Sequence, residues 1–123
     1  MSNWLTDMAA VQSRAILESC NVTDLIFTSG HQIEVRLALS SLQKKQGLSG
    51  LDSVDMGMLF YYEYPTYVPF TMTETNVALD IAHYDIHGRL IQKQVAEALS
   101  IAPITCSRPF TYVLEMPIGT LPS

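Results

Sequence analysis

Acidic and imidazole side chains gather in the stretch "FTMTETNVALDIAHYDIHGRL", which spans residues 70–90. Carboxylates and imidazoles serve as metal ligands and as general acids or bases, so the composition raises the question of a metal or catalytic site. The members of the group are Glu74, Asp80, His83, Asp85 and His87. Whether they converge depends on the structural element that carries them.

A strand followed by a turn is the element that this pattern predicts. Period-2 alternation over residues 77–86 places His83 and Asp85 on one face and Asp80 on the other. His87 falls in the turn "DIHG", in which Gly88 is expected to have a positive φ. His83 and Asp85 would supply half a metal site at best, so we expect neither a metal ion nor a cofactor.

Two carboxylates, Asp80 and Glu115, stand inside predicted strands among small or apolar residues. An unpaired buried charge is costly, so each must reach water or find hydrogen-bond donors. Asp80 is either an anchor that accepts backbone or hydroxyl hydrogen bonds from Thr73 or Thr75, or part of a pocket floored by its two alanine neighbours. Two such carboxylates can do acid–base work when they lie close together, but the sequence does not place them within reach of each other.

The two cysteines, Cys20 and Cys106, lie far apart in the sequence and outside any metal-binding spacing. We expect two free thiols rather than a disulfide. Arg108 can lower the pKa of the Cys106 thiol and favour a nucleophile, but a buried, inert thiol is the preferred interpretation.

Composition limits the classes of function that the chain can have. Its 123 residues suit one domain, and 48% hydrophobic residues with 15% charged residues indicate a packed core. The net charge of −5 and the scattered basic residues argue against nucleic-acid binding. No run of 18 apolar residues and no secretory signal occur, so we expect a cytoplasmic protein without a membrane span.

A helix is predicted over residues 3–19, within an N-terminal helical extension at 1–21 that precedes a single domain at 22–123. Packing of its apolar stripe on the domain is the preferred interpretation, and docking of a partner or of a second copy is the alternative. The stripe consists of Trp4, Leu5, Met8, Val11, Ala15 and Ile16.

The remaining pattern predicts an α+β domain dominated by antiparallel sheet. Two prolines, Pro65 and Pro69, are expected to interrupt the chain between strands. A short helix is expected at 42–46, capped by Ser40 or Ser41 and ended by Gly47. Strands are expected at 22–27, 31–39, 57–64, 77–86, 89–95 and 110–116, with a further extended segment at 70–73.

Four segments resemble the ordered motifs of the DUF192 family, a family of small domains of unassigned function. They are "QGLSGL" at 46–51, "GMLFYYE" at 57–63, the stretch at 70–91 and "YVLEMPIG" at 112–119. The resemblance implies a β-rich α+β domain built on a curved, partly closed, barrel-like sheet.

The same resemblance points to a candidate pocket, since four polar or polarisable residues fall on family motif positions: Met72, Thr75, Asp80 and Glu115. The segment at 70–74 lacks the Trp, Lys and Asn of the family pattern, and "GLSG" lacks its basic residue. A site that used those basic residues is altered or lost in this chain.

Three functions follow as hypotheses. The first is a non-enzymatic binding or interaction module, because no nucleophile–base constellation, phosphate loop or metal motif occurs. The second is a small-molecule-binding protein or enzyme with a polar pocket around Asp80 and Glu115. The third is a structural component of a larger assembly, such as a phage particle. A homo-oligomer would form through Trp4, Leu5, Met8 and Val11.

Overall fold

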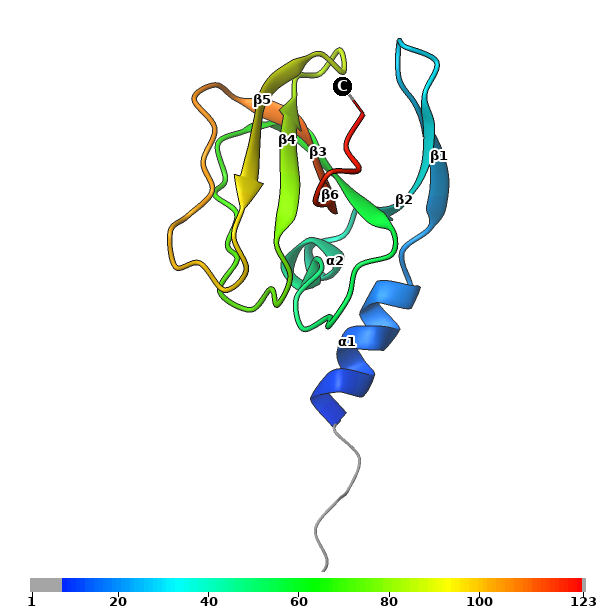
Figure 1. Cartoon of the computed structure of the whole chain (residues 1–123), viewed down its shortest axis with the longest axis vertical. Coiled ribbons are helices and arrows are strands. Elements are labelled where there is room, and N and C mark those ends of the chain that lie inside the picture. The colour runs from blue at the N-terminus through cyan, green and yellow to red at the C-terminus, as the bar shows by residue number, and fades with distance from the viewer. Residues whose placement is uncertain (1–7, 123) are drawn as a thin grey trace, which may run out of the picture.

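The structure is a computed structural model that describes residues 8–122, and Figure 1 shows its arrangement. Two helices and six strands form within these residues, as the α+β prediction requires. Their bounds are α1 Met8–Glu18, β1 Val22–Ile26, β2 Gln32–Ala38, α2 Ser41–Gln46, β3 Gly57–Thr66, β4 Leu79–Tyr84, β5 Leu90–Ala96 and β6 Phe110–Pro117.

The six strands make one mixed sheet in the order β1-β2-β3-β6-β4-β5. Every neighbouring pair is antiparallel except β2 and β3, which run parallel. This parallel pair was not predicted. It forms because the connection between the two strands, which contains α2, is long enough to carry the chain back to the starting end of β2.

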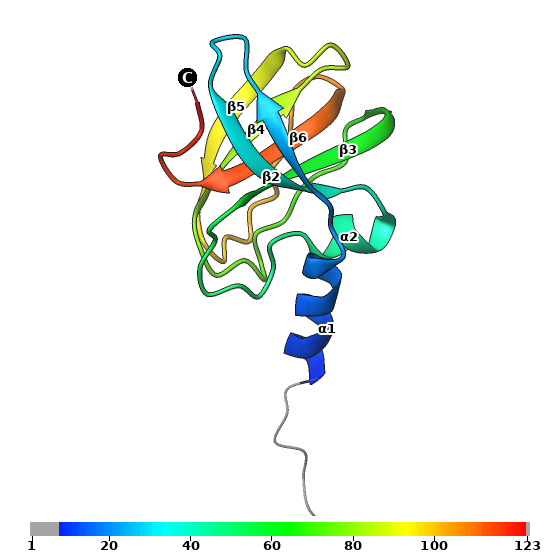
Figure 2. The ribbon, with the colours of Figure 1, turned by 90° about the vertical axis from the view of Figure 1, so that its right-hand side faces the viewer.

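The sheet is strongly curved, as Figure 2 shows, but it is open. Within residues 8–122, the edge strands β1 and β5 do not pair with each other. The curvature expected from the family resemblance is therefore present, whereas closure into a barrel is not seen.

Helix α2 begins and ends beside the capping residues that the sequence predicts. The Ser40 side chain accepts a hydrogen bond from the Gln43 backbone N–H at 3.1 Å, and the Gln43 side chain accepts one from the Ser40 backbone N–H at 3.1 Å. Gly47 ends the helix with φ 50°, and its N–H donates to the Gln43 carbonyl. This confirms the predicted cap and end of the short helix.

Apolar residues cover both faces of the sheet, and the two faces differ in size. The main core gathers buried residues of one face, including Met58, Phe60, Ile81 and Val113. A smaller cluster covers the other face. Its buried members are Val35, Leu59, Leu114 and Met116. The predicted alternation of β4 is confirmed, since Leu79 and Ile81 belong to the main core and Tyr84 packs on the other cluster.

Two segments differ from the predicted pattern. β3 runs through Pro65 to Thr66, where its register with β6 shifts after Tyr61. A proline is tolerated there because the regular hydrogen-bond ladder is already interrupted. The predicted extended segment at 70–73 makes only an isolated bridge between Phe70 and Ile104, so it is a loop rather than a strand.

Helix α1 extends away from the sheet and meets the domain at its C-terminal end (Figures 1 and 2). Leu17 packs against the main core, and the Gln43 Nε2 donates to the Ser19 Oγ at 3.1 Å. Ala15 is exposed and Val11 is 47% exposed, so these two residues of the predicted stripe do not pack on the domain. The side chains of Trp4, Leu5 and Met8 lie outside the described residues.

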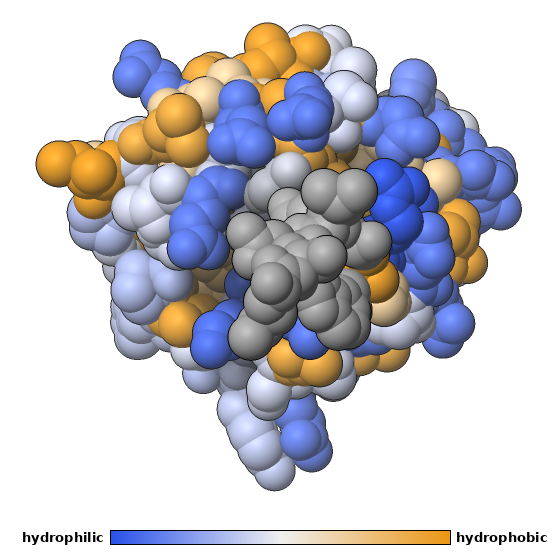
Figure 3. Space-filling view, turned by 90° about the horizontal axis from the view of Figure 1, so that it is seen from below, coloured by the Kyte–Doolittle hydropathy of each residue, from blue (hydrophilic) through white to orange (hydrophobic). Residues whose placement is uncertain are grey.

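Seen from below the view of Figure 1, apolar and hydrophilic residues are mixed over the visible surface (Figure 3). Neither helix of the described chain is long and apolar enough to cross a membrane.

Candidate functional site

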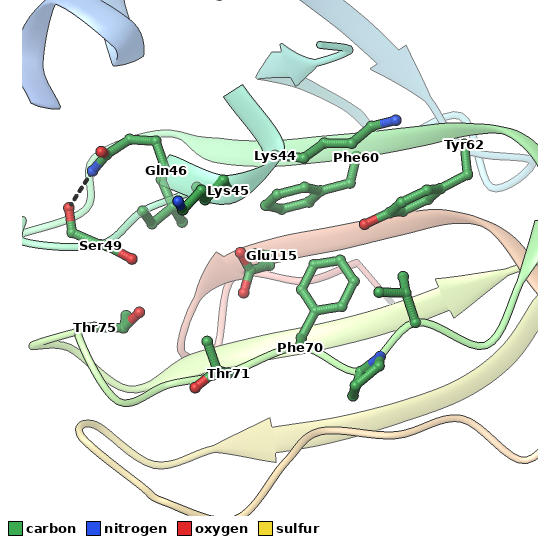
Figure 4. A pocket seen from close by; sticks show the side chains of 14 residues that line it. Lys44, Lys45, Gln46, Ser49, Phe60, Tyr62, Phe70, Thr71, Thr75 and Glu115 are labelled. Atoms are coloured by element: carbon green, nitrogen blue, oxygen red, sulfur yellow. Dashed lines mark hydrogen bonds between the residues drawn. The ribbon is translucent and has the colours of Figure 1, made fainter. Parts of the chain in front are cut away.

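A pocket of about 350 Å³ opens between α2 with its following turn and the loop that contains Phe70. It lies on the face of the sheet that carries the main core, and Figure 4 shows it from close by. Polar and charged side chains of its lining are Lys44, Lys45, Gln46, Ser49, Tyr62, Thr71, Thr75 and Glu115. Its apolar side chains are Leu48, Phe60, Val68, Pro69 and Phe70.

Local backbone geometry holds the two walls in place. On the α2 side, Gly47 lies beside the Phe60 ring, since a Cβ on this glycine would lie 3.4 Å from the ring, an ordinary van der Waals contact. The Gln46 amide donates to the Ser49 carbonyl at 3.1 Å, as Figure 4 shows. On the opposite side, Phe70 and Ile104 exchange backbone hydrogen bonds of 2.9 and 2.8 Å, which fix the loop that carries Phe70.

Aromatic rings form the apolar part of the pocket. Phe60 and Phe70 meet edge to face with ring centroids 4.9 Å apart, and Tyr62 lies 6.4 Å from Phe70. The Lys44 ammonium sits 4.2 Å from the centroid of the Tyr62 ring, a cation–π contact. Burial lowers the pKa of Lys44 and raises the pKa of Tyr62 to about 12, with the Glu115 carboxylate adding to the second effect.

Glu115 is the acid of the pocket lining. Its side chain, which is only 5% exposed, projects from β6 into the space between the two walls (Figure 4). Among the described residues, no side chain or backbone group donates a hydrogen bond to its carboxyl oxygens, and burial raises its pKa from 4.5 to about 8. At neutral pH the group is therefore mainly a carboxylic acid, with one O–H donor and free acceptor capacity.

The structure places the four sequence-predicted site residues in three different environments. Thr75 and Glu115 line the pocket, whereas Met72 is fully buried in the main core. Asp80 lies on the opposite face of the sheet, because it pairs with Met116 while Glu115 pairs with Ile81. Asp80 and Glu115 therefore do not face a common space.

Asp80 has a direct hydrogen-bond partner in the turn after β6. Its Oδ2 accepts a hydrogen bond from the Gly119 backbone N–H at 2.8 Å. This geometry is that of the anchor interpretation, with Gly119 as donor in place of Thr73 or Thr75.

His83, for which the sequence predicted no site role, is a buried titratable group. Its ring is fully buried and contacts Phe110 and Phe70 edge to face, with centroids 4.7 and 6.2 Å away. Within the described chain neither ring nitrogen has a hydrogen-bond partner, and burial lowers the pKa of the imidazole. The available signal was its position on the same face as Leu79 and Ile81.

The turn at 85–88 has the predicted form. Gly88 has φ 76°, and the Asp85 Oδ1 accepts hydrogen bonds from the backbone N–H groups of His87 and Arg89, both at 2.9 Å. These two bonds hold the pKa of Asp85 below its usual value. His87 is exposed, so the two histidines lie in different environments.

Other reactive groups do not gather around the pocket. Within residues 8–122, no three His, Cys, Asp or Glu side chains are placed to hold a metal ion. Cys20 and Cys106 are both free and buried, as expected, and burial raises the pKa of the Cys20 thiol.

A second, larger groove of about 760 Å³ lies on the other face of the sheet. It runs between the β1–β2 turn and the β4–β5 turn and is mostly apolar. Residues from both sides line it, among them Leu25, Phe27, Leu59, Tyr84, Arg89 and Tyr112. None of the four sequence-predicted site residues belongs to its lining.

The open, mixed six-stranded sheet with its two helices defines a small α+β domain. The family model of DUF192, described as Uncharacterized ACR, matches residues 25–123, and the chain belongs to this family. The match begins inside β1, after helix α1.

Two solved structures share this fold. A protein of Sinorhizobium meliloti 1021, described as a "putative transcription regulator", is 33% identical, with a TM-score of 0.71 and 79% of each chain covered. A protein of unknown function from Novosphingobium aromaticivorans DSM 12444 is 26% identical, with a TM-score of 0.71. That match covers 81% of this chain and 74% of the other. Among curated proteins, none matches the chain.

Proposed function

We propose that the domain binds a small organic molecule in the pocket between α2 and the Phe70 loop, with Glu115 orienting the ligand. The observation that carries this proposal is a buried carboxyl group that faces a pocket and has no protein donor among the described residues. The carboxyl oxygens of Glu115 are not among the fully buried side-chain atoms of the described chain that lack a partner, so they face the open space of the pocket and can pair with a ligand there.

The position of the family motifs supports the same pocket. Two of the four residues on family motif positions, Thr75 and Glu115, contribute to its lining. None of those four residues lines the opposite groove. The family motifs therefore favour the smaller pocket as the functional one.

A binding role suits the pocket better than an enzymatic one. Its described lining contains no cysteine or histidine, and Glu115 has no basic partner within hydrogen-bonding distance. Ligands are commonly held in concave, largely apolar sites with a few polar groups, which is the composition found here.

The experiment is a titration of the ¹⁵N-labelled full chain with benzamide, a neutral aromatic probe that can accept a hydrogen bond from Glu115. We expect chemical-shift changes at the Gly47 and Thr75 amides. Thr71→Trp, a change at the exposed mouth of the pocket, should abolish them, whereas Thr23→Trp on exposed β1 should not. Changes confined to other regions, or unaffected by Thr71→Trp, would contradict the proposal.

A ligand-sensing role would agree with the description of the S. meliloti relative as a "putative transcription regulator". Direct contact of this domain with DNA is not part of the proposal. The chain carries a net charge of −5, and duplex DNA selects surfaces rich in Lys and Arg.

We propose, as a second role, that α1 mediates association of two copies through its apolar stripe. The motivation is that Val11 is 47% exposed on a helix that meets the domain only near its C-terminal end. Light scattering of the full chain should give a dimer, and a chain lacking residues 1–14 should give a monomer. A full-length monomer would rule out this role of the helix.

A further inference from the structure

We propose that the ligand is a small organic anion with a planar apolar body, attracted by Lys44 and Lys45 and hydrogen-bonded by the carboxylic acid of Glu115. This inference rests on the proposed function, because it names the ligand class for the same pocket. Charge, wall composition and the protonation of the acid each support it.

The charges around the pocket select for a negative ligand. Lys44 and Lys45 are the cationic side chains of its described lining, and Glu115 is the acidic one. Burial keeps Glu115 mainly protonated at neutral pH, and the Tyr62 phenol is neutral as well. The pocket is thus positive in a chain whose overall charge is −5, which favours entry of an anion.

The walls select for a flat apolar body. Phe60 and Phe70 contact each other edge to face and together form one apolar surface of the pocket, which Val68 and Pro69 extend. Aromatic and aliphatic walls of this kind bury a ring efficiently, while the few polar groups fix its orientation.

A cationic ligand is the main alternative, since aromatic faces and a carboxyl group can together hold an ammonium. In this pocket the face of Tyr62 is already occupied by the Lys44 ammonium at 4.2 Å. A second cation would meet both lysines and would have to ionise a buried acid. The geometry therefore favours the anion.

Binding of an anion should depend on pH through Glu115. Below about pH 8 the acid donates a hydrogen bond to the ligand, and above that pH its carboxylate repels the ligand. The other titratable groups that line the pocket are Lys44, Lys45 and Tyr62. Loss of charge from Lys44 at high pH would act in the same direction, so a variant must separate the two effects.

The test compares three probes of similar shape on the full chain: benzoate, benzamide and benzylammonium. Affinities are measured from the amide shifts of Gly47 and Thr75 at pH 7. We expect benzoate to bind at least about tenfold more tightly than either of the others, a difference of about 1.4 kcal/mol. Tighter binding of benzamide or benzylammonium overturns the ligand class but leaves the pocket as a binding site. Absence of binding by all three contradicts the proposed function as well.

Two substitutions identify the side chains that cause the preference for benzoate and its dependence on pH. Lys45→Gln should weaken benzoate at least about fivefold and leave benzamide unchanged, because it removes charge at the rim. Lys93→Gln, at an exposed residue of β5 outside the pocket, is the matched charge control and should change neither. Glu115→Gln keeps a hydrogen-bond donor and should remove the loss of benzoate affinity near pH 8. Equal effects of the two lysine variants, or a retained pH dependence in Glu115→Gln, would overturn the inference.

Discussion

Glu115 and His83 project from neighbouring strands on the same face of the sheet, because Glu115 pairs with Ile81 and His83 with Val113. Burial acts on their pKa values in opposite directions, raising that of the acid and lowering that of the imidazole. Both groups are therefore mainly neutral at pH 7, and each should make the stability of the domain depend on pH.

Glu115 should destabilise the fold as pH rises from about 4.5 to about 8. In this window the unfolded chain has released the proton that folded Glu115 still binds, so the free energy of unfolding falls by at most roughly 1.4 kcal/mol per pH unit. Glu115→Gln should remove this dependence. Urea denaturation at pH 5 and pH 8 tests it, and equal pH dependence in the two proteins would show that Glu115 is ionised in the fold.

His83 should destabilise the fold in acid. Below about pH 6.5 the unfolded chain gains a proton that the folded imidazole does not, so stability falls as pH decreases. His83→Leu removes two buried polar atoms without partners in the described chain. We therefore expect the free energy of unfolding at pH 7 to stay the same or to rise by up to about 1 kcal/mol. The advantage should grow at pH 5.5.

Exposed His87 provides the control for that change, since His87→Gln should leave the unfolding curve the same at both pH values. A His83→Leu protein that is less stable than the wild type at pH 5.5 would contradict the neutral, unpaired state of the ring.

At the scale of the elements, the hydrogen bond from Gly119 to Asp80 ties the turn after β6 to β4. Asp80→Ala removes the acceptor and should lower the free energy of unfolding by about 1–2 kcal/mol. Asp80→Asn keeps an acceptor oxygen and should cost less. Thermal denaturation with amide exchange at Gly119 measures both, and equal losses in the two variants would contradict the anchoring role.

The close approach of β3 to β6 depends on the absence of a side chain at Gly57. A Cβ there would collide with the Met116 sulfur and lie 2.8 Å from the Glu115 carbonyl oxygen. Gly57→Ala should therefore destabilise the domain by about 1–3 kcal/mol, as overpacking does elsewhere. Chemical denaturation tests this, and a variant as stable as the wild type would mean that the strands separate without cost.

For the molecule as a whole, local patterns predicted most of the secondary structure. Alternation placed Leu79, Ile81 and His83 on one face, and Ser40 with Gly47 marked the limits of α2, because these signals act over a few residues. The parallel pairing of β2 with β3 was not predictable in this way. It depends on a long connection rather than on either strand.

The candidate site was predictable only in part for the same reason. Glu115 was recognised as an acid inside a strand, but its separation from Asp80 follows from the register between β4 and β6. Its pocket also needs Lys45 and Phe70, which come from two distant segments. Long-range register and loop packing determine such a site, and a single sequence does not reveal either.

The proposed function depends on Glu115 being a neutral acid in the free protein that hydrogen-bonds the ligand in its pocket. The most direct measurement is the titration of its carboxyl carbon by ¹³C NMR in the full chain, without and with saturating benzoate. We predict a midpoint at about pH 8 in the free protein and a higher midpoint with benzoate, because the protonated acid is the binding form. A midpoint near 4.5, or one that benzoate leaves unchanged, would contradict the claim.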